Sequence, residues 1–158
     1  MIRKLPNEVF DYIYRQVPRL CVEVLIVTSR GIILAKRLIP ACAGMWHIPG
    51  GTVYHGEKLE EAVIRIADDE LGVYINIKKM IGVIQYPKLC EKKSSHPVGI
   101  VFLCELKSEE QKFRGSFQAE DIEAFRIIPD DTVPEQKIFL DEFLEKLETG
   151  KLDREKIL

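Results

Sequence analysis

The segment from residue 46 to residue 73, WHIPGGTVYHGEKLEEAVIRIADDELGV, constrains the fold of this chain more than any other. Gly50-Gly51 permits a tight turn that exposes backbone carbonyls. Apolar residues then recur at helical spacing from Glu57 to Leu71, and Gly72 follows as the expected C-cap. The segment therefore predicts a short strand, a glycine turn and an amphipathic helix in direct succession.

Strand-like runs lie on both sides of this expected helix. Residues 21–37, CVEVLIVTSRGIILAKR, read as two strands around a hairpin turn at Ser29-Arg30-Gly31. Further strands are expected over residues 74–87, 98–107 and 122–129, and a polar, loop-like stretch over residues 108–121. Helices are expected over about residues 6–17 and over residues 134–147. This order predicts an α/β fold in which helices flank a mixed sheet.

The bulk properties indicate one soluble domain. A length of 158 residues fits a single core, and a net charge of -2 gives no reason to expect a nucleic-acid or membrane partner. The four cysteines form no C-x-x-C pair and no usual zinc spacing, which fits reduced thiols. The N-terminus lacks a signal-peptide core, and no apolar run is long enough to span a bilayer, so the expected compartment is the cytoplasm.

Glu70 is the carboxylate in this segment that most needs an explanation. It lies four residues after Ile66 and so falls on the inward-facing row of the helix, where a carboxylate is costly unless it is paired or binds a cation. Asp69 is adjacent and can pair with Arg65 at i, i+4 spacing. Carboxylates and a backbone carbonyl are hard oxygen donors that suit Mg²⁺, and Mg²⁺ in turn suits a pyrophosphate substrate.

These residues resemble the Nudix box, G-x5-E-x7-R-E-U-x-E-E-x-G-U, in which U is a bulky aliphatic residue. The matching positions are Gly51, Glu57, Arg65, Glu70, Gly72 and Val73. The resemblance extends over roughly residues 18–147 and implies one Nudix domain over residues 1–158 with an α/β/α sandwich fold. It also implies a requirement for Mg²⁺ or Mn²⁺ and hydrolysis of a nucleoside diphosphate linked to another group, and it is compatible with a homodimer.

Three positions of the box differ from the family pattern. Ile66 stands where the box has a glutamate, Ala67 stands where it has a bulky aliphatic residue, and Asp69 replaces the first of the two paired glutamates. The GDP-mannose mannosyl hydrolases are a branch of the family that also replaces the first of these glutamates with an aliphatic residue. The stretches Ala35-Lys36-Arg37 and Gly82-Val83-Ile84-Gln85 resemble that branch as well.

That branch cleaves at the sugar carbon, and two of its features have no match here. Thr52 occupies the position of its arginine after the box glycines, and residues 118–123, QAEDIE, lack the histidine that serves as its base. A carboxylate from this stretch, Glu120 or Asp121, is therefore one candidate base beside a metal-bound water, and His96 is a second.

The candidate site combines residue chemistry with this resemblance. The expected metal ligands are Gly50 and Glu70, helped by Asp69 and Asp121. The expected catalytic residues are Glu70, Asp69, Glu120, Asp121 and Arg65, although Arg65 can equally serve to hold the loop to the helix. The expected substrate-binding residues are Arg37, Lys36, Tyr86 and His96, with the two cations on the diphosphate and the tyrosine against a base or sugar.

The sequence favours a nucleoside diphosphate sugar as the substrate and leaves two other functions open. A nucleotide-binding module with little or no catalysis is one, because Ile66 and Asp69 both depart from the box. A pyrophosphatase that acts on noncanonical nucleoside triphosphates is the other. The base, the sugar and the bond cleaved also stay open.

Overall fold

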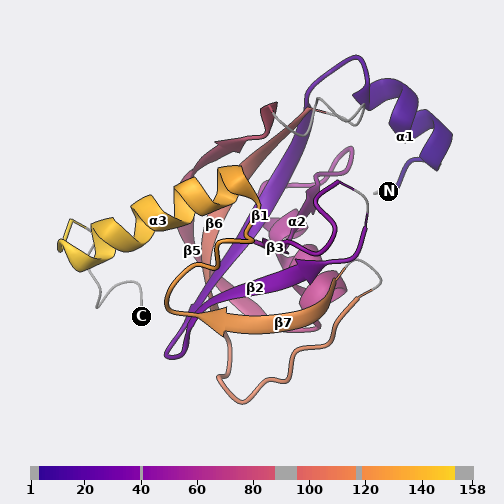
Figure 1. The fold of residues 1–158 in the computed structure, drawn as a ribbon. Coiled ribbons are helices and arrows are strands. Elements are labelled where there is room, and N and C mark those ends of the chain that lie inside the picture. Colours follow the sequence, from indigo (N-terminus) through magenta and orange to yellow (C-terminus); the bar gives the residue numbers. More distant parts are fainter. Residues whose placement is uncertain (1–3, 40, 88–95, 117–118, 152–158) are drawn as a thin grey trace.

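The computed structural model describes residues 4–39, 41–87, 96–116 and 119–151. Its elements in chain order are α1 (Asn7–Tyr14), β1 (Arg19–Thr28), β2 (Gly31–Arg37), β3 (Trp46–His47), β4 (Gly50–Thr52), α2 (Leu59–Ile66), the π-helix η1 (Ala67–Leu71), β5 (Ile75–Gln85), β6 (Pro97–Leu106), β7 (Ala119–Phe125) and α3 (Pro134–Glu148). Figure 1 shows these elements along the chain. No helix in the described ranges is both long enough and apolar enough to cross a membrane.

The sheet is mixed, and β1 is its central strand. The strand order is β3-β2-β1-β6-β5, with β4 paired to β1 and β7 paired to β2. The neighbours β1 and β6 run parallel over eight residue pairs, from Arg19↔Pro97 to Ile26↔Cys104. The other pairings are antiparallel, including the β1–β2 hairpin that was expected at residues 29–31. Hydrogen bonds on both sides and burial on both faces explain why β1 is almost continuously apolar.

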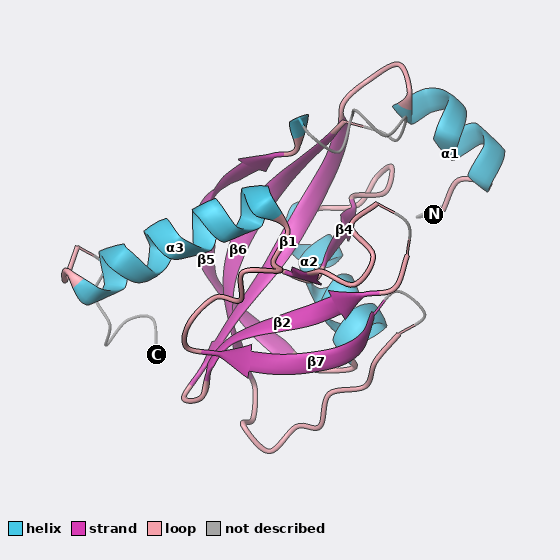
Figure 2. Ribbon diagram, in the orientation of Figure 1, coloured by secondary structure: helices cyan, strands magenta, loops and turns pink. Residues whose placement is uncertain are grey.

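Helices cover both faces of this sheet. The side chains of β1 alternate between the two faces and so contribute to a core on each side. Val24 and Ile26 pack in one core cluster with α2, whereas Leu25 and Val27 pack in the other with α3. Figure 2 shows α3 in front of β5 and β6, α2 behind the sheet, and α1 set apart at one end. The α/β/α sandwich predicted from the sequence is therefore confirmed.

Two of the expected boundaries were wrong, one because of strand pairing and the other because of a local hydrogen bond. The polar stretch over residues 108–121 was expected to be a loop, but its last three residues belong to β7, which pairs with β2 in the register Arg37↔Ala119 and Ala35↔Ile122. The central helix was expected to begin at Glu57, but α2 begins at Leu59 because the Glu57 carboxylate accepts a hydrogen bond from the Tyr54 N–H, at 2.9 Å, within the preceding turn.

Candidate functional site

A π-helical turn carries Glu70 into the interior of the protein. Helix α2 runs directly into η1, and the side chains of Ile66 and Glu70 are 2% and 5% exposed. Gly72 then ends the helix in a left-handed conformation, with φ of 65°, and its N–H donates to the Asp68 carbonyl at 2.9 Å. Single π-turns within helices frequently occur at functional sites. The predicted inward position of Glu70 is thus confirmed. The sequence did not predict that this turn would be a π-helix.

The Glu70 carboxylate is buried and incompletely satisfied. Its Oε2 has no hydrogen-bond partner among the described residues. The pKa of Glu70 is raised to about 7, mainly by burial; a hydrogen bond from the Gly50 backbone and the charge of Arg37 act against this rise, and the charge of Asp69 adds to it. A buried carboxylate oxygen without a partner is costly, and a cation would compensate for that cost.

A second buried carboxylate, Glu23 of β1, lies against the same glycine. Gly50 pairs with Glu23 in the β1–β4 register, and a Cβ atom at position 50 would overlap Glu23 Oε2. Glycine is therefore required at position 50 by this close approach. Burial raises the pKa of Glu23 to about 8, the hydrogen bond from Tyr86 lowers it, and the charge of Glu70 raises it.

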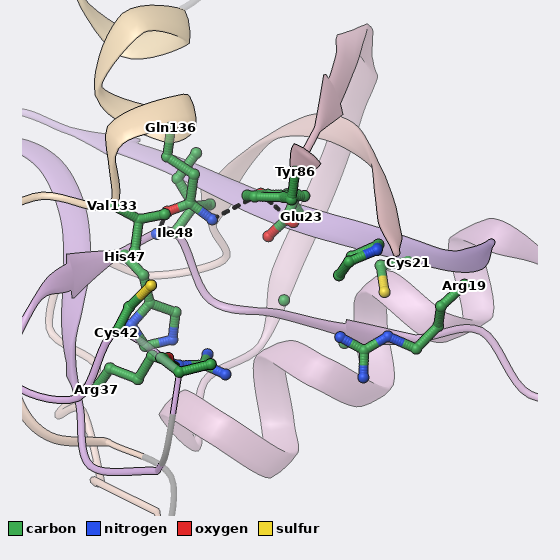
Figure 3. A pocket seen from close by; sticks show the side chains of 14 residues that line it. Arg19, Cys21, Glu23, Arg37, Cys42, His47, Ile48, Tyr86, Val133 and Gln136 are labelled. Atoms are coloured by element: carbon green, nitrogen blue, oxygen red, sulfur yellow. Dashed lines mark hydrogen bonds between the residues drawn. The ribbon is translucent and has the colours of Figure 1, made fainter. Parts of the chain in front are cut away.

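A chain of buried hydrogen bonds holds the Glu23 side chain in place. The Tyr86 hydroxyl donates to Glu23 Oε1 at 2.6 Å, and Gln136 Nε2 donates to the Tyr86 hydroxyl at 2.9 Å. Gln136 is fixed in turn, since its Oε1 accepts from the Ile48 N–H at 2.7 Å. Glu23 lies in β1, Tyr86 directly follows β5, and Gln136 lies in α3. Figure 3 shows these three side chains meeting at one small cavity. Buried and mutually bonded groups of this kind are rigid.

Arg37 brings positive charge to the two carboxylates. Its Nε donates to the Ala41 carbonyl at 2.7 Å, and the returning loop adopts positive φ angles at Ala41 and Cys42, of 63° and 67°. Burial lowers the pKa of the Arg37 guanidinium, and the charges of Glu70 and Glu23 act in the opposite direction. The loop therefore fixes the direction of the Arg37 side chain through its Nε.

Arg65 is engaged in the structure of the loop before α2. Its Nε and Nη2 donate to the two Glu57 oxygens at 2.7 and 2.9 Å, and Nη2 also donates to the Thr52 carbonyl at 3.0 Å. Its guanidinium carbon lies 4.0 Å from the centroid of the Tyr54 ring, and Asp69 lies 3.6 Å away as a weaker ion-pair partner. Of the two roles considered for Arg65, these contacts favour the structural one.

His47 is a buried neutral base at the edge of the small cavity. Its Nδ1 lies 2.7 Å from the Ala35 carbonyl, and since a carbonyl only accepts, Nδ1 carries the proton and Nε2 does not. The pKa of His47 is lowered to about 4, mainly by burial and also by the charge of Arg37. The imidazole is therefore neutral at physiological pH.

Two cavities meet at Gly50 and Arg37. The larger is an open cleft of about 690 Å³ whose lining includes Asp69, Glu70 and Ile66 as well as residues of α1. The smaller, of about 70 Å³, is lined by Glu23 and its hydrogen-bonded partners. A cleft of the larger size suits a small organic ligand such as a nucleotide derivative.

The donor set fits a divalent cation that is shared with a substrate. Within the described ranges, no three His, Cys, Asp or Glu side chains cluster closely enough to form a complete metal cage. Mg²⁺ does not require such a cage, because it is commonly bound through one or two carboxylates together with substrate phosphates and water. Glu70 with its unpartnered oxygen, Asp69 and the Gly50 backbone would supply such a partial site.

Several other predicted site residues lie away from this cluster. Lys36 alternates with Arg37 along β2 and instead places its Nζ 5.3 Å from the centroid of the Trp46 ring. Asp121 is exposed in β7, next to Ile122, which packs toward α2, so that Asp121 faces the opposite side of the sheet. The side chain of Glu120 lies outside the described part of the chain. The roles of these three residues stay predictions.

Tyr86 and His96, the other two residues expected to bind substrate, do not line the large cleft beside Glu70. Tyr86 is 3% exposed and takes part in the buried bonds to Glu23 and Gln136, so it contributes an edge hydroxyl to the small cavity and no open stacking face. His96 is exposed, and its backbone carbonyl accepts from the Arg19 N–H at 2.7 Å.

Glu23 is the functional candidate that the sequence analysis missed. The signal was present, since Glu23 interrupts an otherwise apolar run in a strand that is buried on both faces. A charged residue in such a run needs a partner or a function. Its neighbours Tyr86 and Gln136 come from 63 and 113 residues further along the chain, so no local pattern connects them.

Comparison with known proteins identifies the family. The sequence profile of the NUDIX domain matches residues 17–147, and the chain therefore belongs to the NUDIX family. A solved Nudix hydrolase from Nitrosomonas europaea superposes with a TM-score of 0.72 at 20% identity, covering 85% of this chain and 74% of that one. A solved MutT Nudix hydrolase from Burkholderia pseudomallei has a TM-score of 0.68 at 25% identity, covering 80% of this chain and 98% of that one.

Two curated relatives match over part of the sequence. The low-salt glycan biosynthesis protein Agl8 of Haloferax volcanii is 34% identical over 83 residues, which cover 52% of this chain and 53% of that protein. An ADP-ribose pyrophosphatase of Methanocaldococcus jannaschii is 33% identical over 95 residues, or 60% of this chain and 55% of that protein. The chain thus spans about half the length of the curated relatives it matches.

Proposed function

We propose that this chain is a Mg²⁺- or Mn²⁺-dependent hydrolase of nucleoside diphosphate derivatives, with nucleoside diphosphate sugars as the favoured substrates. The observation that carries the proposal is the buried Glu70 carboxylate. Its Oε2 is unpartnered within the described residues, and it interacts with the Gly50 backbone and the charge of Arg37. A site built this way attracts a cation on one side and offers a guanidinium to phosphate on the other.

The chain's own residues divide the work of binding. Glu70 would hold the cation with help from Asp69 and the Gly50 carbonyl, and the cation, when bound, would neutralise phosphate charge and activate water. Arg37, oriented by the Ala41 carbonyl, would hold the diphosphate by its terminal nitrogens. The cleft beside Glu70 then leaves room for the groups on either side of the diphosphate.

The group that transfers the proton would lie outside α2, since the position of the box glutamate holds Ile66, a buried aliphatic side chain. Glu23 is the strongest candidate in the described residues, because it contacts Gly50 and is held by Tyr86 in the cavity that adjoins Arg37. A carboxylate fixed beside the diphosphate site is suited to general acid–base work.

The substrate class draws support from two directions. Ile66 in place of the box glutamate is shared with the branch that acts on a nucleoside diphosphate sugar. The two curated relatives are named for glycan biosynthesis and for ADP-ribose pyrophosphatase activity, and both names concern sugar-containing compounds.

The test is a panel of nucleoside diphosphate sugars and ADP-ribose incubated with Mg²⁺, with the products identified by mass spectrometry. We expect turnover by the wild type and none by Glu70→Gln. Nucleoside diphosphate with free sugar would indicate cleavage at the sugar carbon, and nucleoside monophosphate with sugar phosphate would indicate cleavage at phosphorus. Turnover that is equal in Glu70→Gln, or absent for the whole panel, would overturn the proposal.

A further inference from the structure

The large cleft has a second wall that the proposed chemistry does not use. One side consists of Gly50, Asp69 and Glu70, where the cation and diphosphate would bind. The opposite side comes from the N-terminal segment and includes Phe10 and Tyr14 of α1. Figure 1 shows α1 beyond the end of β1, separate from the sandwich that forms the core.

Helix α1 contributes no side chain to either core cluster of the described residues. None of its eight residues, all of which are described, is buried. Phe10 and Tyr14 stand one helical turn apart and make an edge-to-face pair with ring centroids 4.6 Å apart, whereas Tyr12 points elsewhere and is 70% exposed. The helix therefore presents an aromatic face to the cleft and keeps a polar, solvated face outside.

Arg19 adds a donor to this aromatic face. Its guanidinium carbon lies 5.6 Å from the centroid of the Phe10 ring, and it lines the same cleft. Its Nε is buried without a hydrogen-bond partner among the described residues. An unsatisfied N–H at this place is costly unless a ligand accepts from it.

We propose that Phe10, Tyr14 and Arg19 form the binding surface for the nucleoside base of the substrate. The inference rests on the proposed function for the position of the diphosphate, which directs the rest of the molecule along the cleft toward α1. A nucleobase matches the surface in two respects: its flat π-face stacks on an aromatic ring, and its edge carries the carbonyl or ring-nitrogen acceptors that Arg19 requires.

A direct binding measurement tests the base site independently of catalysis. Isothermal titration calorimetry in Mg²⁺ would compare ADP, GDP, UDP and inorganic pyrophosphate on the wild type, Phe10→Ala, Tyr14→Ala and the control Tyr12→Ala. We expect loss of either cleft-facing ring to weaken the nucleoside diphosphates roughly tenfold or more. Pyrophosphate, which has no base, should bind unchanged, and Tyr12→Ala should match the wild type.

Further variants separate stacking from folding. Phe10→Leu keeps an apolar side chain without a π-face, so it should bind nucleoside diphosphates as weakly as Phe10→Ala while unfolding like the wild type. Arg19→Gln should reduce the differences in affinity among the three bases. Equal weakening of pyrophosphate and nucleoside diphosphates, unchanged affinity in both ring variants, or no nucleotide binding by the wild type would each overturn the inference. Base-dependent binding without hydrolysis would support it and overturn the proposed function instead.

Discussion

Replacing Glu70 by glutamine should remove turnover and, at the same time, stabilise the metal-free protein. Burial raises the pKa of Glu70 from 4.5 to about 7, so the native state holds this proton more tightly than the unfolded state does. The free energy of unfolding therefore falls as the pH rises from about 4.5 to about 7, because over this range the unfolded state releases the proton and the native state keeps it. Glutamine has nearly the same shape and cannot ionise, so it avoids this loss.

The size of the gain follows from the two pKa values. Because Glu70 ionises more readily in the unfolded chain than in the metal-free native state, the unfolding free energy is lower by about 3 kcal/mol at pH 8 and by about 1 kcal/mol at pH 5.5. Glu70→Gln should thus exceed the wild type in stability by those amounts in EDTA. In the proposed function, Mg²⁺ would bind the ionised carboxylate of the native state, so adding Mg²⁺ should stabilise the wild type alone.

Urea unfolding at both pH values, in EDTA and in Mg²⁺, measures all of these differences. The control Glu60→Gln changes an exposed glutamate of α2 and should behave as the wild type does in every buffer. A Glu70→Gln protein that is less stable than the wild type in EDTA at pH 8 would refute the reasoning. So would an equal stabilisation of both proteins by Mg²⁺.

Three other changes test the surroundings of Glu70. Gly50→Ala should cost about 1–3 kcal/mol in urea unfolding and abolish turnover, because its methyl group would overlap Glu23; wild-type stability would contradict the close approach. His47, whose pKa is lowered to about 4, contributes stability that is present above pH 6.5 and lost below it, so the wild type should lose about 2 kcal/mol more than His47→Asn between pH 7 and pH 5. Glu57→Gln should lower the unfolding free energy by roughly 1–3 kcal/mol by weakening the paired hydrogen bonds from Arg65, and an unchanged melting temperature would argue against that clamp.

The sequence predicted the order of elements and the inward position of Glu70. The glycine turn, the amphipathic helix and the C-capping glycine are all local features, and each acts within a few residues of its own position. The inward position of Glu70 followed from its spacing to Ile66, and the structure confirms its burial. The prediction of a loop was wrong at residues 119–121, where pairing with β2 overrides a polar composition that suits a loop.

What the sequence by itself determined is the set of residues in fixed local register, from Gly50 to Gly72, and the hairpin of strands over residues 21–37. The tertiary structure alone decided which distant side chains meet them. Glu23, Tyr86 and Gln136 come together because the parallel pairing of β1 with β6 and the packing of α3 bring separate parts of the chain to one end of the sheet. Spacing along a helix or strand follows from backbone geometry, whereas contacts between elements depend on how whole faces pack, which no short stretch of sequence specifies.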